Sequence, residues 1–244
     1  HKEKYNSKLV HRIDGLLTEY SSTSRFELDE LALRLNAYAD LTIVQSQYSM
    51  NQFHENNKSL KKTKIIYNSV DRSIFYKKKE KDLNKNINIK LISSSWSANK
   101  NKGMDDYLWL DKNLLSKTSH KIEYCFVGRL DFIPKNIKLI KPQGQIGLAN
   151  KFNDSDIFIY SAKNDTCPNV LLEAIACGLP VIYKNAGGPK ELVKKFGLAY
   201  EEVEEIPFLL DEMIRNLDYF KNLVKKHRIE NAPEQYAKEL LKLI

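Results

Sequence analysis

Residues 156–183, DIFIYSAKNDTCPNVLLEAIACGLPVIY, place two apolar runs on either side of a segment that begins with proline and ends with glycine. Both apolar runs are short and are typical of buried strands. Pro168 suits the first turn of a helix, where its missing N–H is not needed, and Gly178 suits a helix end. A strand, a helix and a second strand in this order predict two parallel strands joined by a helix.

The same alternation of apolar runs and helical patterns continues along most of the chain. Further strands are predicted at residues 8–14, 40–46, 63–68, 87–95, 122–127 and 136–141. Strands that alternate with helices form parallel sheets flanked by helices, and such sheets bind ligands beyond the carboxyl ends of their strands. The predicted fold class is therefore α/β. From Glu204 onward the pattern is helical.

Residues 24–39 carry one of the helical patterns. Ser24 and Glu27 have the spacing of a capping box at its start. The apolar residues that fall on one face are Leu28, Leu31, Ala32 and Leu35. This pattern predicts an amphipathic helix.

The composition limits the class of partner. Of 244 residues, 42% are apolar and 29% are charged, which excludes a disordered or collagen-like chain. The formal net charge is +8, but only seven of the 39 basic residues are arginine, the usual reader of bases and phosphates. Nucleic acid is therefore not expected as a partner. Lysine clusters at 61–64 and 76–81 favour contact with an anionic membrane surface, with a plain solvated surface as the alternative.

The absence of recognisable targeting signals and the cysteine spacing lead us to expect a protein inside the cell. No apolar run approaches the roughly 20 residues of a transmembrane helix, and the first residues lack the apolar core of a secretion signal. The three cysteines have no CxxC spacing, so neither a disulfide framework nor a zinc site is expected, and Cys125 and Cys177 are predicted to be buried. We expect a cytoplasmic protein, with peripheral contact to the inner membrane face as one option.

The helix that begins at Pro168 predicts a binding site. Its amino end lies at the ligand-binding edge of the sheet, where the N–H groups of Asn169, Val170 and Leu171 and the helix dipole can hold a phosphate. Glu173, one turn further on, suits neutral hydroxyls such as those of a ribose, and the loop residue Asp165 suits a sugar. From spacing alone, a turn role for Asp165 and a lysine partner for Glu173 stay equally open.

Three segments resemble the family 4 retaining glycosyltransferases of the GT-B fold. Residues 156–193 are similar to the donor-site signature, in which two glutamates separated by seven residues precede a glycine pair and a further glutamate. Here these positions are Asp165 and Glu173, then Gly187, Gly188 and Glu191. IIYNSVDRSIF at 65–75 and SSSWSANKNKG at 93–103 resemble two further segments of that family. Together with the early strands, the resemblance covers most of the chain.

The resemblance implies transfer of a sugar from a UDP- or GDP-type nucleotide diphosphate sugar to a glycan or lipid-linked acceptor, with retention at the anomeric carbon. It implies no metal and no further cofactor. It places Asp165 and His11 at the donor sugar and Lys102 at the leaving diphosphate, as the catalytic residues. The donor-binding residues that it implies are Glu173 at the ribose, together with Pro168, Asn169, Val170, Leu171, Lys100, Ser97 and Gly188.

Some positions depart from the family pattern. Asp165 stands where the family usually has glutamate, and Ser97 stands near the position of an arginine, which leaves Lys100 or Lys102 to supply the positive charge. Trp96, in a polar loop, is a candidate to stack on a base or a sugar, with a role in lining the cleft as the alternative.

The domain organisation follows from the same comparison. The expected division is residues 1–75 as the latter part of an N-terminal domain, 76–88 as a linker, 89–225 as the donor-binding domain and 226–244 as a closing helix. The first part predicts too few strands for a complete domain, and the start at histidine favours a piece of a longer protein over a shortened relative. The alternative functions are a catalytically idle sugar nucleotide-binding module and a sugar-nucleotide epimerase or hydrolase.

Overall fold

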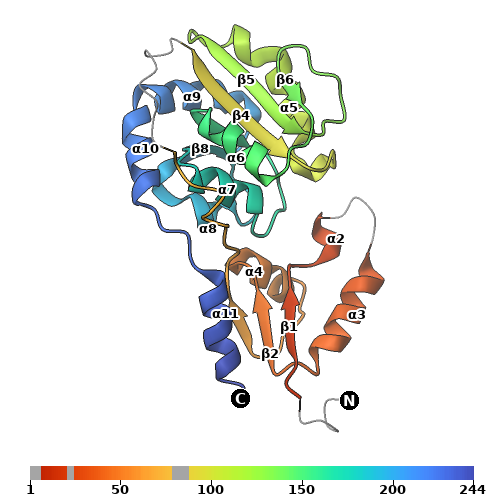
Figure 1. Ribbon diagram of the computed structural model, residues 1–244. Coiled ribbons are helices and arrows are strands. Elements are labelled where there is room, and N and C mark those ends of the chain that lie inside the picture. The colour runs from red at the N-terminus through yellow and green to blue at the C-terminus, as the bar shows by residue number, and fades with distance from the viewer. Residues whose placement is uncertain (1–6, 21–24, 79–87) are drawn as a thin grey trace.

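The computed structural model of the chain describes residues 7–20, 25–78 and 88–244, which form two parallel sheets (Figure 1). The first sheet has the strand order β1-β2-β3, and its strands are β1 (Val10–Ile13), β2 (Leu41–Val44) and β3 (Thr63–Ile65). The second sheet has the order β6-β5-β4-β7-β8-β9, and its strands are β4 (Ile89–Ser95), β5 (Ile122–Gly128), β6 (Lys138–Ile140), β7 (Ile157–Tyr160), β8 (Val181–Lys184) and β9 (Gly197–Tyr200). The predicted α/β class is confirmed.

Helices lie between these strands and after the last one. The α-helices of the described residues are α2 (Leu17–Tyr20), α3 (Phe26–Asn36), α4 (Gln47–Glu55), α5 (Met104–Asn113), α6 (Gln145–Asn153), α7 (Asn169–Ala176), α8 (Pro189–Val193), α9 (Ile206–Arg215), α10 (Leu217–Lys226) and α11 (Ala232–Leu241). Short 3-10 turns adjoin some of them, among them η1 (Lys100–Lys102) directly before α5. The predicted strands are all present, whereas β9 was not predicted, because four residues that begin with glycine give too weak a pattern.

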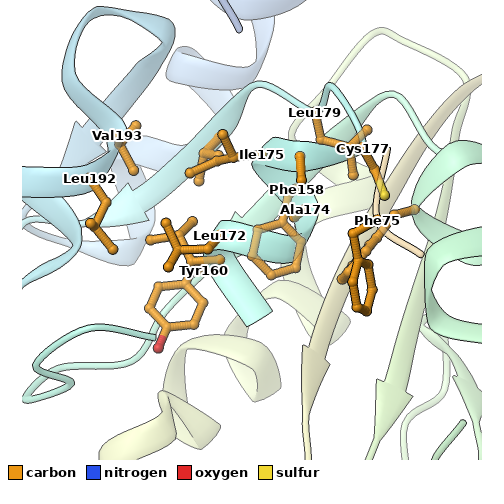
Figure 2. Packing of buried hydrophobic residues seen from close by; sticks show 14 of the residues in the cluster. Phe75, Phe158, Tyr160, Leu172, Ala174, Ile175, Cys177, Leu179, Leu192 and Val193 are labelled. Carbon is orange, nitrogen blue, oxygen red and sulfur yellow. The ribbon is translucent and has the colours of Figure 1, made fainter. Parts of the chain in front are cut away.

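The core of the second sheet lies on both of its faces. All four residues of β7 are buried, as expected for a parallel strand covered on both sides. On one face, Phe158 and Tyr160 pack with Leu172 and Ile175 of α7 (Figure 2), and a second cluster on the other face includes Ile159. Among the cysteines, Cys177 is buried as predicted, and Cys125 is only partly buried.

The leucine face of α3 is not part of the core. Leu28, Leu31 and Leu35 are exposed, whereas Asp29 and Asn36, on an adjacent side of the helix, are buried. The Asp29 carboxylate accepts hydrogen bonds from the N–H groups of Leu17 and Thr18 at 2.8 and 3.0 Å, so a polar contact fixes this side of α3. The helix is therefore present, but its inward side is mixed, since Leu33 packs against the cluster of Ile13, Leu16 and Phe53.

The predicted capping box of α3 involves Ser24, which lies outside the described residues. The N-cap of α3 is Arg25, which makes no side-chain capping bond. Most of the predicted linker 76–88 also lies outside the described ranges, and the domain boundaries stay predictions.

The last helix, α11, packs on the first sheet. Ala232 shares a buried cluster with Leu41 and Ile43 of β2, and Tyr236 packs against it. Figure 1 shows α11 beside this sheet, so both chain halves contribute to that side of the molecule.

Gly103 brings the turn that carries Lys102 close to the end of β7. Its φ of 82° lies in the left-handed region, and a Cβ added there would lie 2.4 Å from the Cβ of Ser161. Because an L side chain fits neither the conformation nor the space, glycine is required at this junction of η1 and α5.

We predict that Gly103→Ala lowers the free energy of unfolding by at least about 1–2 kcal/mol, because it adds backbone strain and a collision with Ser161. Gly144→Ala is the matched control, since nothing lies within 4 Å of its added methyl group and its φ is −66°. Chemical denaturation of the two variants measures the difference. Equal midpoints for Gly103→Ala and the unchanged chain would contradict the prediction.

Candidate functional site

A cleft of about 500 Å³ opens between the carboxyl ends of the two sheets. The first half of the chain lines it with Arg12, Asp14, Gln45 and Asn68, and the second half lines it with residues of the loops after β4 and β7. Residues that directly follow parallel strands therefore meet across it, as is usual for ligand sites in such sheets. The volume is in the range of small-molecule binding sites.

The amino end of α7 faces this cleft. Pro168, Asn169 and Val170 line it, and Pro168 is the N-cap without a side-chain capping bond. The first N–H groups of a helix have no carbonyl partner within the helix, and the helix dipole adds positive potential at the same place. Leu171 is fully buried, so only its backbone can contribute. This helix start therefore suits an anionic group.

Asp165, Lys102 and Tyr160 meet at the wall of the cleft. The Nζ of Lys102 forms an ion pair with Oδ2 of Asp165, and the Tyr160 hydroxyl donates to the same oxygen at 2.8 Å. The Tyr160 ring packs in the core with its hydroxyl at the edge (Figure 2), and burial raises the pKa of this phenol well above its ordinary value. Tyr160 therefore stays protonated and holds the Asp165 carboxylate in place.

A glycine pair supports the loop that carries Asp165. The N–H of Gly188 donates to the Asp165 carbonyl at 2.8 Å, and a Cβ at Gly188 would lie 1.8 Å from the carbonyl oxygen of Thr166. Gly187 has a φ of 70° and lies against the same loop. Gly188 does not line the cleft, so the structure gives this predicted donor-site residue a supporting position behind Asp165.

Glu173 lies one turn further along α7, outside the residues that line the cleft. Burial raises the pKa of its carboxyl to about 7. In the part of the chain that the structure describes, its side chain has no ion pair and no hydrogen bond, so the lysine partner considered above is absent there. A half-buried carboxylate without a partner is costly unless something else donates to it.

His11 does not line the cleft. Its Nδ1 lies 3.3 Å from the amide nitrogen of Asn36, on the side of α3, whereas the next residue, Arg12, lines the cleft. Successive residues of a strand point to opposite faces, which separates the two side chains. The geometry thus offers Arg12, and not His11, to a ligand.

The residues of the loop after β4 differ in whether they line the cleft. Ser97 lines the cleft, and its hydroxyl accepts the N–H of Asn99 at 3.2 Å. Trp96 also lines it and is 58% exposed. Lys100 is exposed and does not line the cleft, so of the two candidate lysines only Lys102 is placed at the site.

Asn68 joins the two halves at the cleft, a role that the sequence did not reveal. Its amide nitrogen donates to the carbonyl of Cys167 at 2.9 Å and to the side chain of Asn169 at 2.8 Å. Its amide oxygen accepts from Arg12 at 3.2 Å. A second hollow of about 320 Å³, which reaches Tyr236 of α11, shares these three residues Arg12, Asn68 and Asn169 with the main cleft.

The described ranges show neither a metal-ion cluster nor a membrane-spanning helix. Within residues 7–20, 25–78 and 88–244, no three His, Cys, Asp or Glu side chains are grouped so that they could hold a metal ion. Over the same ranges, no helix combines the length and the apolar character that crossing a membrane requires.

Comparison with known proteins gives a family match. The family model described as "Glycosyl transferases group 1" matches residues 75–230. The chain is 24% identical over 220 residues to N-acetyl-alpha-D-glucosaminyl L-malate synthase of Bacillus anthracis. The aligned region covers 82% of this chain and 57% of that protein. The chain therefore spans little more than half the length of this relative. A shorter stretch of 46 residues is 44% identical to the GDP-mannose-dependent alpha-mannosyltransferase of Mycobacterium tuberculosis, over 19% of this chain and 12% of that protein.

Solved structures show the same fold. HepE of Anabaena, crystallised with UDP, matches with a TM-score of 0.77 and 19% identity, over 99% of this chain and 74% of that chain. At such identity the likeness shows the fold, which is of the GT-B type. Because the family match extends over more than half of the sequence, the chain belongs to the group 1 glycosyl transferases.

Proposed function

We propose that the chain binds a nucleotide diphosphate sugar in the cleft and takes part in transfer of the sugar to a hydroxyl acceptor, with retention at the anomeric carbon. The observation that carries the proposal is the amino end of α7, which opens into the cleft a short distance from Lys102 and Asp165. Its N–H groups would hold the diphosphate, and family membership supports this assignment.

Lys102 would stabilise the leaving group. Breaking the bond between the anomeric carbon and the phosphate oxygen builds negative charge on the departing diphosphate, and a fixed ammonium beside it lowers the barrier. Lys102 is paired with Asp165 in the structure, so the donor would share this ammonium with the carboxylate.

Asp165 would contact the donor sugar. Its carboxylate is one methylene shorter than the glutamate that the family usually has, and its second oxygen is not used by Lys102 or Tyr160. The hydrogen bond from Tyr160 compensates for the shorter side chain by fixing its direction. We assign to Asp165 the orientation of the sugar hydroxyls and the stabilisation of positive charge on the ring carbon.

Glu173 would accept the ribose hydroxyls. A bound diol would supply the donors that this half-buried carboxylate otherwise lacks, so donor binding and ionisation of Glu173 support each other. The nucleotide of the donor would be UDP or GDP. Two similar proteins support this choice: HepE was crystallised with UDP, and another protein is named as GDP-mannose-dependent. Metal ions are not part of this proposal.

The acceptor would enter on the side of the first sheet. Arg12, Asp14 and Gln45 line the cleft there, and the adjoining hollow extends toward Tyr236. We propose a glycan or lipid-linked acceptor and a cytoplasmic enzyme whose lysine-rich surface contacts the inner face of a membrane.

A thermal-shift panel with UDP, GDP, UDP-glucose and GDP-mannose tests the proposal, followed by transfer assays with the donor that binds. In the thermal-shift panel, we expect stabilisation either by the uridine nucleotides or by the guanosine nucleotides. In the transfer assay, we expect a glycoside with the anomeric configuration of the donor, determined by NMR. Absence of any shift contradicts donor binding. Binding without transfer to any tested acceptor contradicts the transferase function and leaves a sugar nucleotide-binding module.

We predict that Lys102→Met lowers kcat about 100- to 1,000-fold, because it removes a fixed cation from the leaving group. Lys100→Met is the matched control, since Lys100 lies in the same turn but outside the cleft, and its kcat should stay within about twofold. Steady-state kinetics of the two variants decide the point. Equal losses in both variants would refute a specific role for Lys102.

We predict that affinity for the sugar nucleotide falls as the pH drops from about 8 to 6, because the Glu173 carboxylate, with a pKa of about 7, becomes protonated and loses acceptor capacity. The diphosphate of a sugar nucleotide is esterified at both ends and does not titrate in this range. In Glu173→Gln, affinity should be about 10- to 100-fold lower at pH 8 and independent of pH.

The same variant carries a stability control. The folded-state pKa of Glu173 is raised from 4.5 to about 7, so ionisation costs stability as the pH rises through this window. Without ligand, Glu173→Gln should therefore melt at a higher temperature than the unchanged chain at pH 8 and at a similar temperature near pH 4. Calorimetry at both pH values measures the melting temperatures. Titrations with the sugar nucleotide, run in parallel, measure the affinity. A pH-independent affinity of the unchanged chain would argue against the ribose role.

A further inference from the structure

Glu191 of α8 crosses from the second half of the chain to the first. Its Oε2 accepts the N–H of Gln47 at 2.8 Å, and its Oε1 accepts the N–H of Tyr48 at 2.6 Å. The Tyr67 hydroxyl also donates to Oε2, at 2.7 Å. One carboxylate therefore receives three hydrogen bonds from residues more than 120 positions away in the sequence.

These contacts complete the amino end of α4. The first helical N–H groups, those of Gln47 and Tyr48, have no partner within the helix and meet Glu191, and the Ser46 hydroxyl accepts the N–H of Ser49 at 3.0 Å. A negative charge at a helix amino end is favoured by the dipole, and bonds to a charged acceptor are stronger than neutral ones. Glu191 is thus a charged cap supplied by the other half of the molecule.

Glu191 is also linked to the loop that carries Asp165. The N–H of Glu191 donates to the carbonyl of Gly188 at 3.0 Å, and the N–H of Gly188 donates to the carbonyl of Asp165 at 2.8 Å. Because Gly188 has no room for a side chain against Thr166, displacement of α8 moves the loop with it. The path from α4 to Asp165 therefore runs through two backbone hydrogen bonds and one side chain.

Neutral contacts cross at the cleft itself. Asn164 donates to the carbonyl of Glu19 at 2.8 Å, and Asn68 binds the α7 loop as described above. Glu191, in contrast, does not line the cleft, and both of its carboxylate oxygens are engaged by the hydrogen bonds to α4 and Tyr67. Its influence on the reaction has to be indirect.

We infer that Glu191 is a positioning residue that clasps α4 and thereby holds the first half of the chain in register with the Asp165 loop. The clasp itself is independent of the reaction, whereas its effect on turnover rests on the proposed function. The clasp explains why a carboxylate follows the glycine pair by three residues: the short helix α8 carries it from the loop to the amino end of α4.

Amide exchange tests the clasp without any substrate. In Glu191→Gln, the side chain loses its charge, and we expect exchange of the Gln47 and Tyr48 amides to accelerate at least about tenfold, with a smaller increase in Tyr67→Phe, which removes one of the three bonds. Glu204→Gln is the matched control, because Glu204 is exposed on the second half of the chain. Exchange rates in Glu191→Gln equal to those of Glu204→Gln would overturn the clasp.

Kinetics test the positioning role. With UDP-glucose as probe, Glu191→Gln should bind the nucleotide within about twofold of the unchanged chain, because the donor contacts lie on the second half, while kcat falls at least about tenfold. Equal kcat in Glu191→Gln and Glu204→Gln, or a parallel loss of binding and turnover, would overturn this role. If UDP-glucose neither binds nor reacts, the donor assignment for this probe fails, and the exchange rates still decide the clasp.

Discussion

The free N–H groups at the start of α7 are the feature on which the proposed chemistry depends. The helix follows a fully buried strand, so its amino end is fixed at the carboxyl edge of the sheet, where the chain leaves the cleft open. Proline at the N-cap brings no side chain that could satisfy these donors. The site thus keeps its positive potential for a ligand, and Lys102 adds a charge nearby, held in place by Asp165.

The second requirement is that two separate sheets keep one geometry around the ligand. Asn68 ties the first half to the α7 loop, and Glu191 ties the second half to α4. These hydrogen bonds lie beside apolar contacts between the two halves, such as those of α11 with the first sheet. The Gly187–Gly188 pair lies directly against the loop that carries Asp165, so α8 and this loop are closely coupled.

The sequence predicted the features that depend on local pattern. The β7–α7–β8 unit, the parallel sheets and the position of Pro168 and Asn169 at the sheet edge follow from apolar runs, proline and glycine. Lys102, which also lines the cleft, was assigned only through the family resemblance. Residues placed by long-range contacts were missed. Asp14, Gln45 and Asn68 come shortly after strands, and the rule that ligands bind at carboxyl strand ends could have indicated them.

Side-chain direction is a feature that the sequence analysis did not resolve. His11 occupies a strand position whose side chain points to α3, and the alternation of strand side chains gives the cleft Arg12 instead. In α3, the periodic leucines identified a helix correctly, but periodicity alone does not determine which side faces inward. The inward side carries Leu33 together with the hydrogen-bonded Asp29. Likewise, no pattern in the sequence connects Glu191 with α4.

The most direct measurement of the central claim is an NMR titration that follows the backbone amides of Asn169, Val170 and Leu171. UDP and GDP are added in separate titrations, each compared with its nucleoside, which has the same base and ribose but no phosphate. The account predicts that one diphosphate shifts these three amides strongly, with saturation, and that its nucleoside leaves them nearly unchanged. Unchanged amides at saturating concentrations of both diphosphates, or equal shifts with the nucleoside, would contradict it.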